Sequence, residues 1–176
     1  MPDTLLPKVL VDKAREVIEA NRKAARRIAV AESCTGGLVS AALTEIAGSS
    51  DVFEAGYVTY SNAAKIRQLK VSEDVVDTFG AVSVATAWAM ARGALAASEA
   101  DVAVAITGIA GPGGGSPEKP VGLVWFGVAL KGGPVAAELN MFADNGRDFI
   151  RRETVRHALE IGLRALGDTQ EMGVVP

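Results

Sequence analysis

The sequence contains one cysteine and one histidine, Cys34 and His157, among its 176 residues. A single cysteine excludes a disulfide within the chain and any cysteine-rich zinc site. A single histidine excludes a multi-histidine metal site, and a Ser-His-Asp triad could form only if His157 supplied its base. We therefore expect no metal centre, and a base other than histidine deserves equal consideration in any nucleophilic mechanism.

An excess of positive charge is also missing. Lys and Arg number 18 against 21 Asp and Glu, which gives a net charge of −3. Nucleic-acid-binding domains usually carry a basic excess, so we expect no nucleic-acid partner, although a local basic pocket for one phosphate is compatible with the composition. No apolar run reaches the roughly 18–20 residues that span a bilayer, and residues 1–4 do not begin a signal peptide. We expect a cytoplasmic protein without a membrane partner.

Hydrophobic residues make up 49% of the chain and charged residues 22%, which is typical of a globular protein. The length predicts one domain over residues 1–176, with a core from about residue 5 to 166 and a tail over 167–176. Apolar periodicity and turn signals predict the secondary structure. The expected helices are 5–26, 38–46, 62–69, 73–78, 83–98 and 147–166, and the expected strands are 27–31, 52–60, 101–106, 121–130 and 135–142.

The order of these elements predicts an α/β fold resembling a three-layer sandwich, with helices flanking a mixed sheet. Helical crossovers between the first three strands favour parallel pairing. The last two strands are joined by Lys131-Gly132-Gly133-Pro134, which predicts an antiparallel hairpin.

The first candidate site is the segment Glu32-Ser33-Cys34-Thr35-Gly36-Gly37, between a strand and a helix. Ligands of open α/β sheets bind at the carboxyl ends of strands, and a helix start there offers free N–H groups to an oxyanion or a phosphate. The plainer alternative is that Ser33 or Thr35 only caps the helix and that the glycines only form the turn.

The second candidate site pairs Tyr60 with Lys65. A lysine in a partly desolvated pocket can have its pKa lowered enough to act as a base toward a serine hydroxyl. An ordinary surface lysine after a strand-end tyrosine is the alternative. The lysine follows the tyrosine by five residues rather than four, and no Gly-x-Gly-x-x-Gly motif is present, so a dinucleotide oxidoreductase is not indicated.

The third candidate site is the glycine-rich segment that begins at Thr107 and follows a buried strand. Such a loop can surround a phosphate or ribose with backbone donors. It lacks the Gly-Lys-Ser/Thr ending of a nucleoside triphosphate-binding loop. Arg147, Arg151 and Arg152 at the start of the last helix could bind a phosphate, or they could be a solvated helix face.

Several of these segments, in the same order, resemble the CinA C-terminal domain family, from about residue 5 to about residue 166. The segments that carry the resemblance are Ala31-Glu32-Ser33-Cys34-Thr35-Gly36-Gly37, Ala47-Gly48-Ser49-Ser50, Val58-Thr59-Tyr60-Ser61-Asn62 with Lys65, Gly80-Ala81-Val82-Ser83, Gly108-Ile109-Ala110-Gly111-Pro112-Gly113-Gly114 and Lys119-Pro120-Val121-Gly122. The chain resembles the stand-alone form of the family, whose characterised enzymes are nicotinamide-nucleotide amidohydrolases of the PncC type.

The resemblance implies a serine amidohydrolase that deamidates nicotinamide mononucleotide in pyridine nucleotide salvage, without a metal or another cofactor. It implies that Ser33 is the nucleophile and that Lys65 and Tyr60 activate it and transfer protons. Substrate binding, including the oxyanion donors, is implied for Thr35, Gly36, Gly37, Thr107, Gly108, Gly111, Pro112, Gly113 and Arg147. Members commonly carry Gly-Asp-Arg before the last helix, where this chain has Asp144-Asn145-Gly146-Arg147. A homo-oligomer is also expected.

Two other interpretations stay open at this point. Cys34 could be the nucleophile, together with Lys65 and Glu32, as in cysteine amidohydrolases. The chain could also be a catalytically weak nucleotide-binding or interaction module of the competence-damage-inducible type.

Overall fold

The structure, a computed structural model, describes residues 4–167. Its centre is one five-stranded sheet with the strand order β2-β1-β3-β4-β5. Strands β1, β2 and β3 are parallel, whereas β4 is antiparallel to both β3 and β5. The strands are β1 (Ile28–Glu32), β2 (Phe53–Val58), β3 (Val102–Gly108), β4 (Leu123–Leu130) and β5 (Val135–Met141). The predicted mixed sheet and its hairpin are therefore confirmed.

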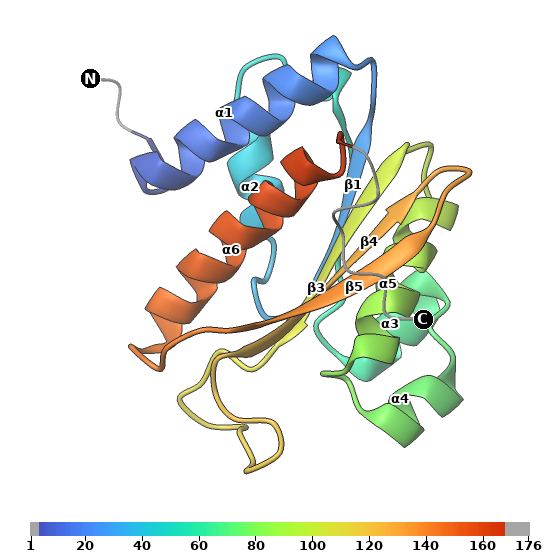
Figure 1. The fold of residues 1–176 in the computed structure, drawn as a ribbon, viewed down its shortest axis with the longest axis vertical. Coiled ribbons are helices and arrows are strands. Elements are labelled where there is room, and N and C mark those ends of the chain that lie inside the picture. Colours follow the sequence, from blue (N-terminus) through green and yellow to red (C-terminus); the bar gives the residue numbers. More distant parts are fainter. Residues whose placement is uncertain (1–3, 168–176) are drawn as a thin grey trace.

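Helices cover both faces of the sheet, which gives the predicted three layers (Figure 1). One face packs against α1 (Lys8–Lys23), α2 (Leu38–Thr44) and α6 (Arg147–Arg164). The other face packs against α3 (Asn62–Leu69), α4 (Glu73–Phe79) and α5 (Val84–Ala96). A short 3₁₀ helix, Ser49–Asp51, precedes β2. The predicted tail beyond residue 167 lies outside the described residues.

The chain changes direction on the sheet between β1 and β3. From β1 it runs through α2 to the outer strand β2, and it then returns through α3, α4 and α5 to β3 on the other side of β1. Strand order reverses at this point, and open α/β sheets bind ligands in the crevice beyond the strand ends there. The fold therefore directs attention to the residues that follow β1, β2 and β3.

Helices α3 and α5 approach each other very closely at Gly93. A Cβ atom added to Gly93 would lie 2.0 Å from the backbone oxygen of Leu69, the last residue of α3. No side chain fits in this space, so the separation of the two helices depends on a glycine at this position.

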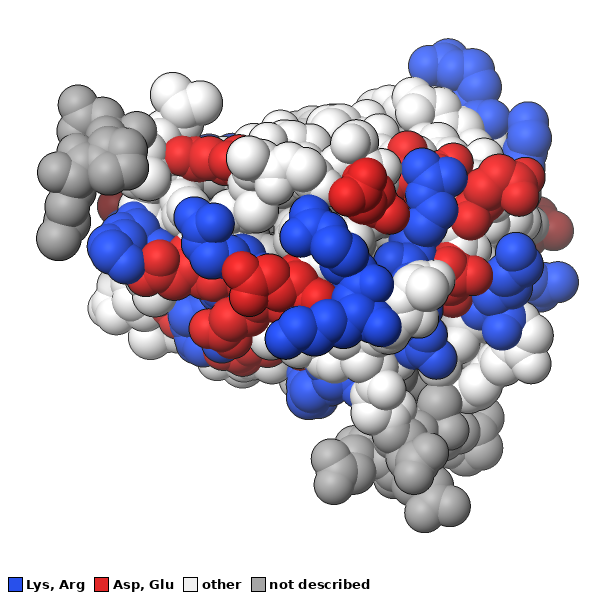
Figure 2. Space-filling view, turned by 90° about the horizontal axis from the view of Figure 1, so that it is seen from above, with Lys and Arg blue, Asp and Glu red and all other residues white. Residues whose placement is uncertain are grey.

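Charged side chains are mixed in sign over the face seen in Figure 2, where acidic and basic groups are interspersed. Ion pairs of the chain include Lys13 with Glu16 at 2.7 Å and Arg156 with Glu160 at 2.5 Å. Among residues 4–167, no helix is both long enough and apolar enough to cross a membrane.

Candidate active site

A cleft of about 270 Å³ lies beyond the carboxyl ends of β1, β2 and β3. It is lined by segments that are far apart in the sequence: the turn after β1, the segments after β2 and before α5, the loop after β3 and the start of α6. The lining residues are Ser33, Cys34, Tyr60, Lys65, Ala81, Val82, Thr107, Gly108, Ile109, Ala110, Gly111, Gly113, Gly114 and Arg147. This is the location that the strand order indicates.

Ser33 and Lys65 meet inside this cleft. Ser33 directly follows β1, where its N–H donates to the Ile106 carbonyl of β3 at 3.1 Å. Lys65 lies on the buried side of α3, a helix capped by Ser61. Its Nζ donates to Ser33 Oγ at 3.0 Å and to the Thr59 carbonyl at 2.8 Å. The serine hydroxyl is thus within hydrogen-bond distance of an amine, the arrangement that an activated nucleophile requires.

Lys65 is only 1% exposed, although it carries an ionisable group. Burial disfavours the ammonium form and lowers the pKa of Lys65 from 10.5 to about 8. On the order of a tenth of the Lys65 side chains is therefore neutral at neutral pH, far more than for a lysine with the ordinary pKa. A neutral amine beside a hydroxyl can accept its proton, so the geometry and the pKa both suit a general base.

Glu32 fixes the turn that carries Ser33. Its fully buried carboxylate accepts N–H bonds from Gly37, Val39 and Ser40 at 2.9–3.1 Å, and a further bond from the Ser40 hydroxyl at 2.8 Å. These are N–H groups at the start of α2 that would otherwise lack partners. The free helix start that the sequence suggested is thus occupied by the protein's own carboxylate.

This arrangement changes the expected set of oxyanion donors. The Gly37 N–H donates to Glu32, and the Gly36 N–H donates to the Ser33 carbonyl at 3.0 Å. Both glycines have positive φ angles, +61° and +99°, so their part here is the turn itself. Neither lines the cleft, and the Thr35 side chain is fully buried. The structure thus argues against Gly36 and Gly37 as oxyanion donors and against side-chain binding by Thr35.

Arg151 contacts the same turn from α6. Its Nε donates to the Cys34 carbonyl at 3.2 Å, and its Nη2 donates to the Thr35 carbonyl at 3.1 Å. Arg151 is not among the residues that line the cleft. It therefore supports the turn rather than the space in which a ligand would lie.

Tyr60 and Arg147 form one wall of the cleft. Arg147 Nη2 donates to the Tyr60 hydroxyl at 3.1 Å, and its Nη1 donates to the Gly111 carbonyl at 2.8 Å. Lys65 reaches only the backbone carbonyl of Tyr60, at 3.4 Å. The altered segment before α6 therefore still brings Arg147 into the cleft, while the Tyr60 hydroxyl is directed to the arginine rather than to the lysine. Tyr60 also follows β2 by two residues instead of ending it.

The end of β3 and the loop after it line the cleft. Thr107 and Gly108 are the last two residues of β3, and Gly111 and Gly113 follow in the loop. The Thr107 hydroxyl donates to the Ala81 carbonyl at 2.7 Å, which ties the end of β3 to the segment before α5. Pro112 is absent from this lining. It borders a neighbouring, more open hollow of about 530 Å³ that Asp144 also lines.

Cys34 is 6% exposed, and burial raises the pKa of its thiol to about 11. The thiolate is the nucleophilic form of cysteine, so this environment suppresses its reactivity. Glu32, the other member of the cysteine alternative, is fully engaged by the start of α2. The geometry therefore favours Ser33 over Cys34 as nucleophile.

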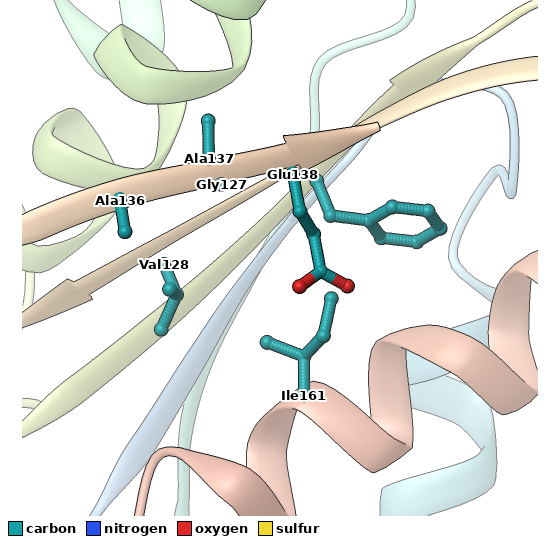
Figure 3. Close-up of a pocket in the computed structure, with 7 residues that line it drawn as sticks. Gly127, Val128, Ala136, Ala137, Glu138 and Ile161 are labelled. Atoms are coloured by element: carbon teal, nitrogen blue, oxygen red, sulfur yellow. The ribbon is translucent and has the colours of Figure 1, made fainter. Parts of the chain in front are cut away.

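His157 lies away from the cleft, beside a small second cavity between the hairpin and α6. Figure 3 shows this cavity, with Glu138 reaching from β5 toward Ile161 of α6. Its volume is about 10 Å³, no more than one water molecule needs. His157 Nε2 and Glu138 Oε1 are 2.5 Å apart, and this bond holds the pKa of Glu138 at about 2. His157 is thus paired with Glu138 and is not among the residues that line the cleft with Ser33.

Sequence reasoning did not assign Glu32 and Arg151 their contacts with the turn, and it missed the Thr59 carbonyl. The sequence did contain a signal for Glu32. This acidic residue directly follows an expected buried strand, and two glycines that precede an expected helix come four and five residues later. The contacts of Arg151 and Thr59 depend on tertiary packing and have no sequence signal. Within residues 4–167, no group of three or more His, Cys, Asp or Glu side chains could hold a metal ion.

Comparison with known proteins identifies relatives over most of the chain. The model of the CinA C-terminal domain matches residues 11–166. A protein of Enterobacter agglomerans named nicotinamide-nucleotide amidohydrolase PncC is 51% identical over 137 residues, which are 78% of this chain and 83% of that protein. A CinA-like protein of Akkermansia muciniphila is 51% identical over 70% of this chain, which spans only 30% of its length. The crystal structure of the competence/damage inducible protein CihA from Agrobacterium tumefaciens has a TM-score of 0.90 at 50% identity and covers 94% of this chain and 100% of that one.

Proposed function

The chain belongs to the CinA C-terminal domain family, and from this we propose that it is an amidohydrolase that converts nicotinamide mononucleotide into nicotinate mononucleotide and ammonia, as a step of pyridine nucleotide salvage. The name of the Enterobacter relative supports the substrate. The single observation that supports the chemistry is the 3.0 Å contact between Lys65 Nζ and Ser33 Oγ inside the cleft.

In the proposed mechanism, neutral Lys65 takes the proton of Ser33 while Oγ attacks the carboxamide carbon. The carbon–nitrogen bond of the resulting tetrahedral intermediate then breaks, and the proton on Lys65 leaves with the nitrogen as ammonia forms. Water, deprotonated by the same lysine, attacks the ester that remains on Ser33. Nicotinate mononucleotide is released and the serine regains its proton. One base thus serves both halves of the reaction.

We assign the oxyanion donor to the N–H group of Cys34, which lines the cleft. This group has no acceptor among the hydrogen bonds within residues 4–167, and the residue after the nucleophile is a common oxyanion donor in serine hydrolases. The nucleotide would lie against the loop after β3, and the Arg147 guanidinium would contact its phosphate or ribose. The Tyr60 hydroxyl accepts from Arg147 and therefore keeps its own proton free for a bond to the substrate.

The direct test is ammonia release from nicotinamide mononucleotide, measured with a chelator present, beside nicotinamide riboside and free nicotinamide. We expect turnover of the mononucleotide to exceed that of the other two amides because only it offers a phosphate to Arg147. Absence of ammonia from folded protein would contradict the proposal. If the mononucleotide then still raised the melting temperature, the chain would be a nucleotide-binding module instead.

The pKa of Lys65 predicts a pH dependence. The active form is neutral, so kcat/KM should rise about tenfold per pH unit below pH 8 and become constant above it. Initial rates of ammonia release from pH 6 to 9.5 would measure this. A rate that falls as the pH rises through 8 would require a protonated group in place of the base.

Replacing Cys34 by alanine should leave kcat within about threefold of the wild type, because the raised pKa of the thiol keeps it protonated. Alanine also avoids the bulk that an alkylating reagent would place in the cleft. Loss of ammonia release in a folded Cys34→Ala protein would favour the cysteine mechanism.

A further inference from the structure

Arg151 lies one turn beyond Arg147 on α6, outside the cleft, with both of its contacts on main-chain carbonyls of the Ser33 turn. We propose that Arg151 is a positioning residue that orients the peptide planes of this turn so that the N–H group of Cys34 faces the reacting carbonyl. This inference rests on the proposed function and concerns how its transition state is stabilised.

The argument follows from the planarity of the peptide bond. In a trans peptide, the carbonyl of one residue and the N–H of the next point in opposite directions. Arg151 holds the Thr35 carbonyl, so the Gly36 N–H of the same peptide is directed away from the arginine and reaches the Ser33 carbonyl. This bond in turn holds the peptide between Ser33 and Cys34, so the Cys34 N–H is directed away from Gly36.

The turn is held from two sides by opposite charges. On one side, the Glu32 carboxylate takes up the N–H groups of Gly37, Val39 and Ser40. On the other side, the Arg151 guanidinium takes up the carbonyls of Cys34 and Thr35. A guanidinium suits this task because its N–H groups form a rigid fork. Between these two anchors, the N–H group of Cys34 lies in the lining of the cleft and is left for a ligand.

The test compares the steady-state kinetics of Arg151→Ala, Arg151→Lys and wild type with nicotinamide mononucleotide. Loss of one oxyanion donor typically lowers kcat by 10²–10³, so we expect Arg151→Ala to lose about 10²-fold in kcat while KM changes by less than about threefold. Arg151→Lys, which keeps one cationic donor, should fall between the two. Millimolar methylguanidinium should restore part of the Arg151→Ala rate in a saturable way and leave the wild-type rate unchanged.

Two neighbours on α6 serve as controls. Arg152, whose guanidinium lies 5.9 Å from the centre of the Phe149 ring, has no hydrogen bond to the turn within residues 4–167 and does not line the cleft, so Arg152→Ala should keep the wild-type kcat and KM. Arg147→Ala should instead raise KM, because Arg147 lines the cleft. The melting temperature of each variant shows whether it is folded, and Arg151→Lys carries the test if Arg151→Ala is not.

An unchanged kcat in folded Arg151→Ala or Arg151→Lys would overturn the inference, as would a rise in KM with kcat unchanged, which would make Arg151 a substrate contact. An inactive wild type would contradict the proposed function instead, so the two failures can be told apart.

Discussion

Replacing Ser33 by alanine should abolish ammonia release from nicotinamide mononucleotide, with a loss in kcat of at least about 10⁴-fold. The hydroxyl is the atom that forms the covalent bond, and alanine has nothing to take its place. Ser33 packs where β1 meets the turn, and its main-chain bond to Ile106 does not involve the side chain. The fold and the binding of the nucleotide should therefore survive, which a thermal shift with the mononucleotide would measure.

Ser116→Ala is the matched control for this experiment, because Ser116 lies in the loop after β3 but outside the lining of the cleft. It should keep the wild-type rate. If folded Ser33→Ala released ammonia within about tenfold of the wild-type rate, another group would be the nucleophile and the proposed mechanism would be wrong.

Replacing Lys65 by methionine should have two large effects that occur together. Activity should fall by a factor similar to that for Ser33→Ala, because the amine in contact with the Ser33 hydroxyl is lost. The pH dependence of stability should also change. In the wild type, the pKa of Lys65 is about 8 in the folded state and near 10.5 in the unfolded state.

The sign of the second effect follows from proton binding. Between pH 8 and 10.5 the unfolded chain holds a proton on this lysine that the folded chain has lost, so the free energy of unfolding rises with pH. Relative to Lys65→Met, the wild type should gain roughly 2–3 kcal/mol of stability between pH 7 and pH 10. Urea unfolding of both proteins at several pH values would measure the difference.

Lys131→Met is a suitable control, because Lys131 is exposed in the turn of the hairpin. It should keep its activity, and its stability should follow that of the wild type at every pH. A constant difference between wild type and Lys65→Met from pH 7 to 10 would mean that Lys65 has an ordinary pKa in the fold, and the neutral-lysine base would have to be abandoned.

Much of this architecture could be predicted because local signals agreed with one another. The buried strands Ile28–Glu32 and Val102–Gly108 are short apolar runs that end at glycine-rich turns, and the hairpin has Gly132-Gly133-Pro134 at its tip. Element ends were less predictable: the strand expected over 52–60 ends at Val58, and the two residues after it serve the site, since the Thr59 carbonyl accepts from Lys65 and Tyr60 lines the cleft.

The candidate site was only partly predictable, because its hydrogen bonds join segments that are far apart. The local sequence around Ser33 and around Lys65 indicates both residues as candidates. It does not show that the Thr59 carbonyl binds the lysine or that Arg151 binds the turn after Ser33. The glycines after Ser33 suggested free N–H groups, and only the fold shows that Glu32 and the Ser33 carbonyl already accept two of them. The expected homo-oligomer stays a prediction.

The close approach of Gly93 to Leu69 affects the geometry of the catalytic residues, although neither residue lines the cleft. Leu69 closes the same short helix that carries Lys65 one turn earlier, and a single methyl group at position 93 would collide with its carbonyl. Any substitution there must move α3, and with it the amine, relative to a serine fixed on the central strands. A genetic screen for inactive proteins should therefore recover substitutions at position 93 as well as at Ser33 and Lys65, although position 93 carries no reacting group. The position of the Lys65 amine thus depends on the absence of a side chain at position 93 of α5.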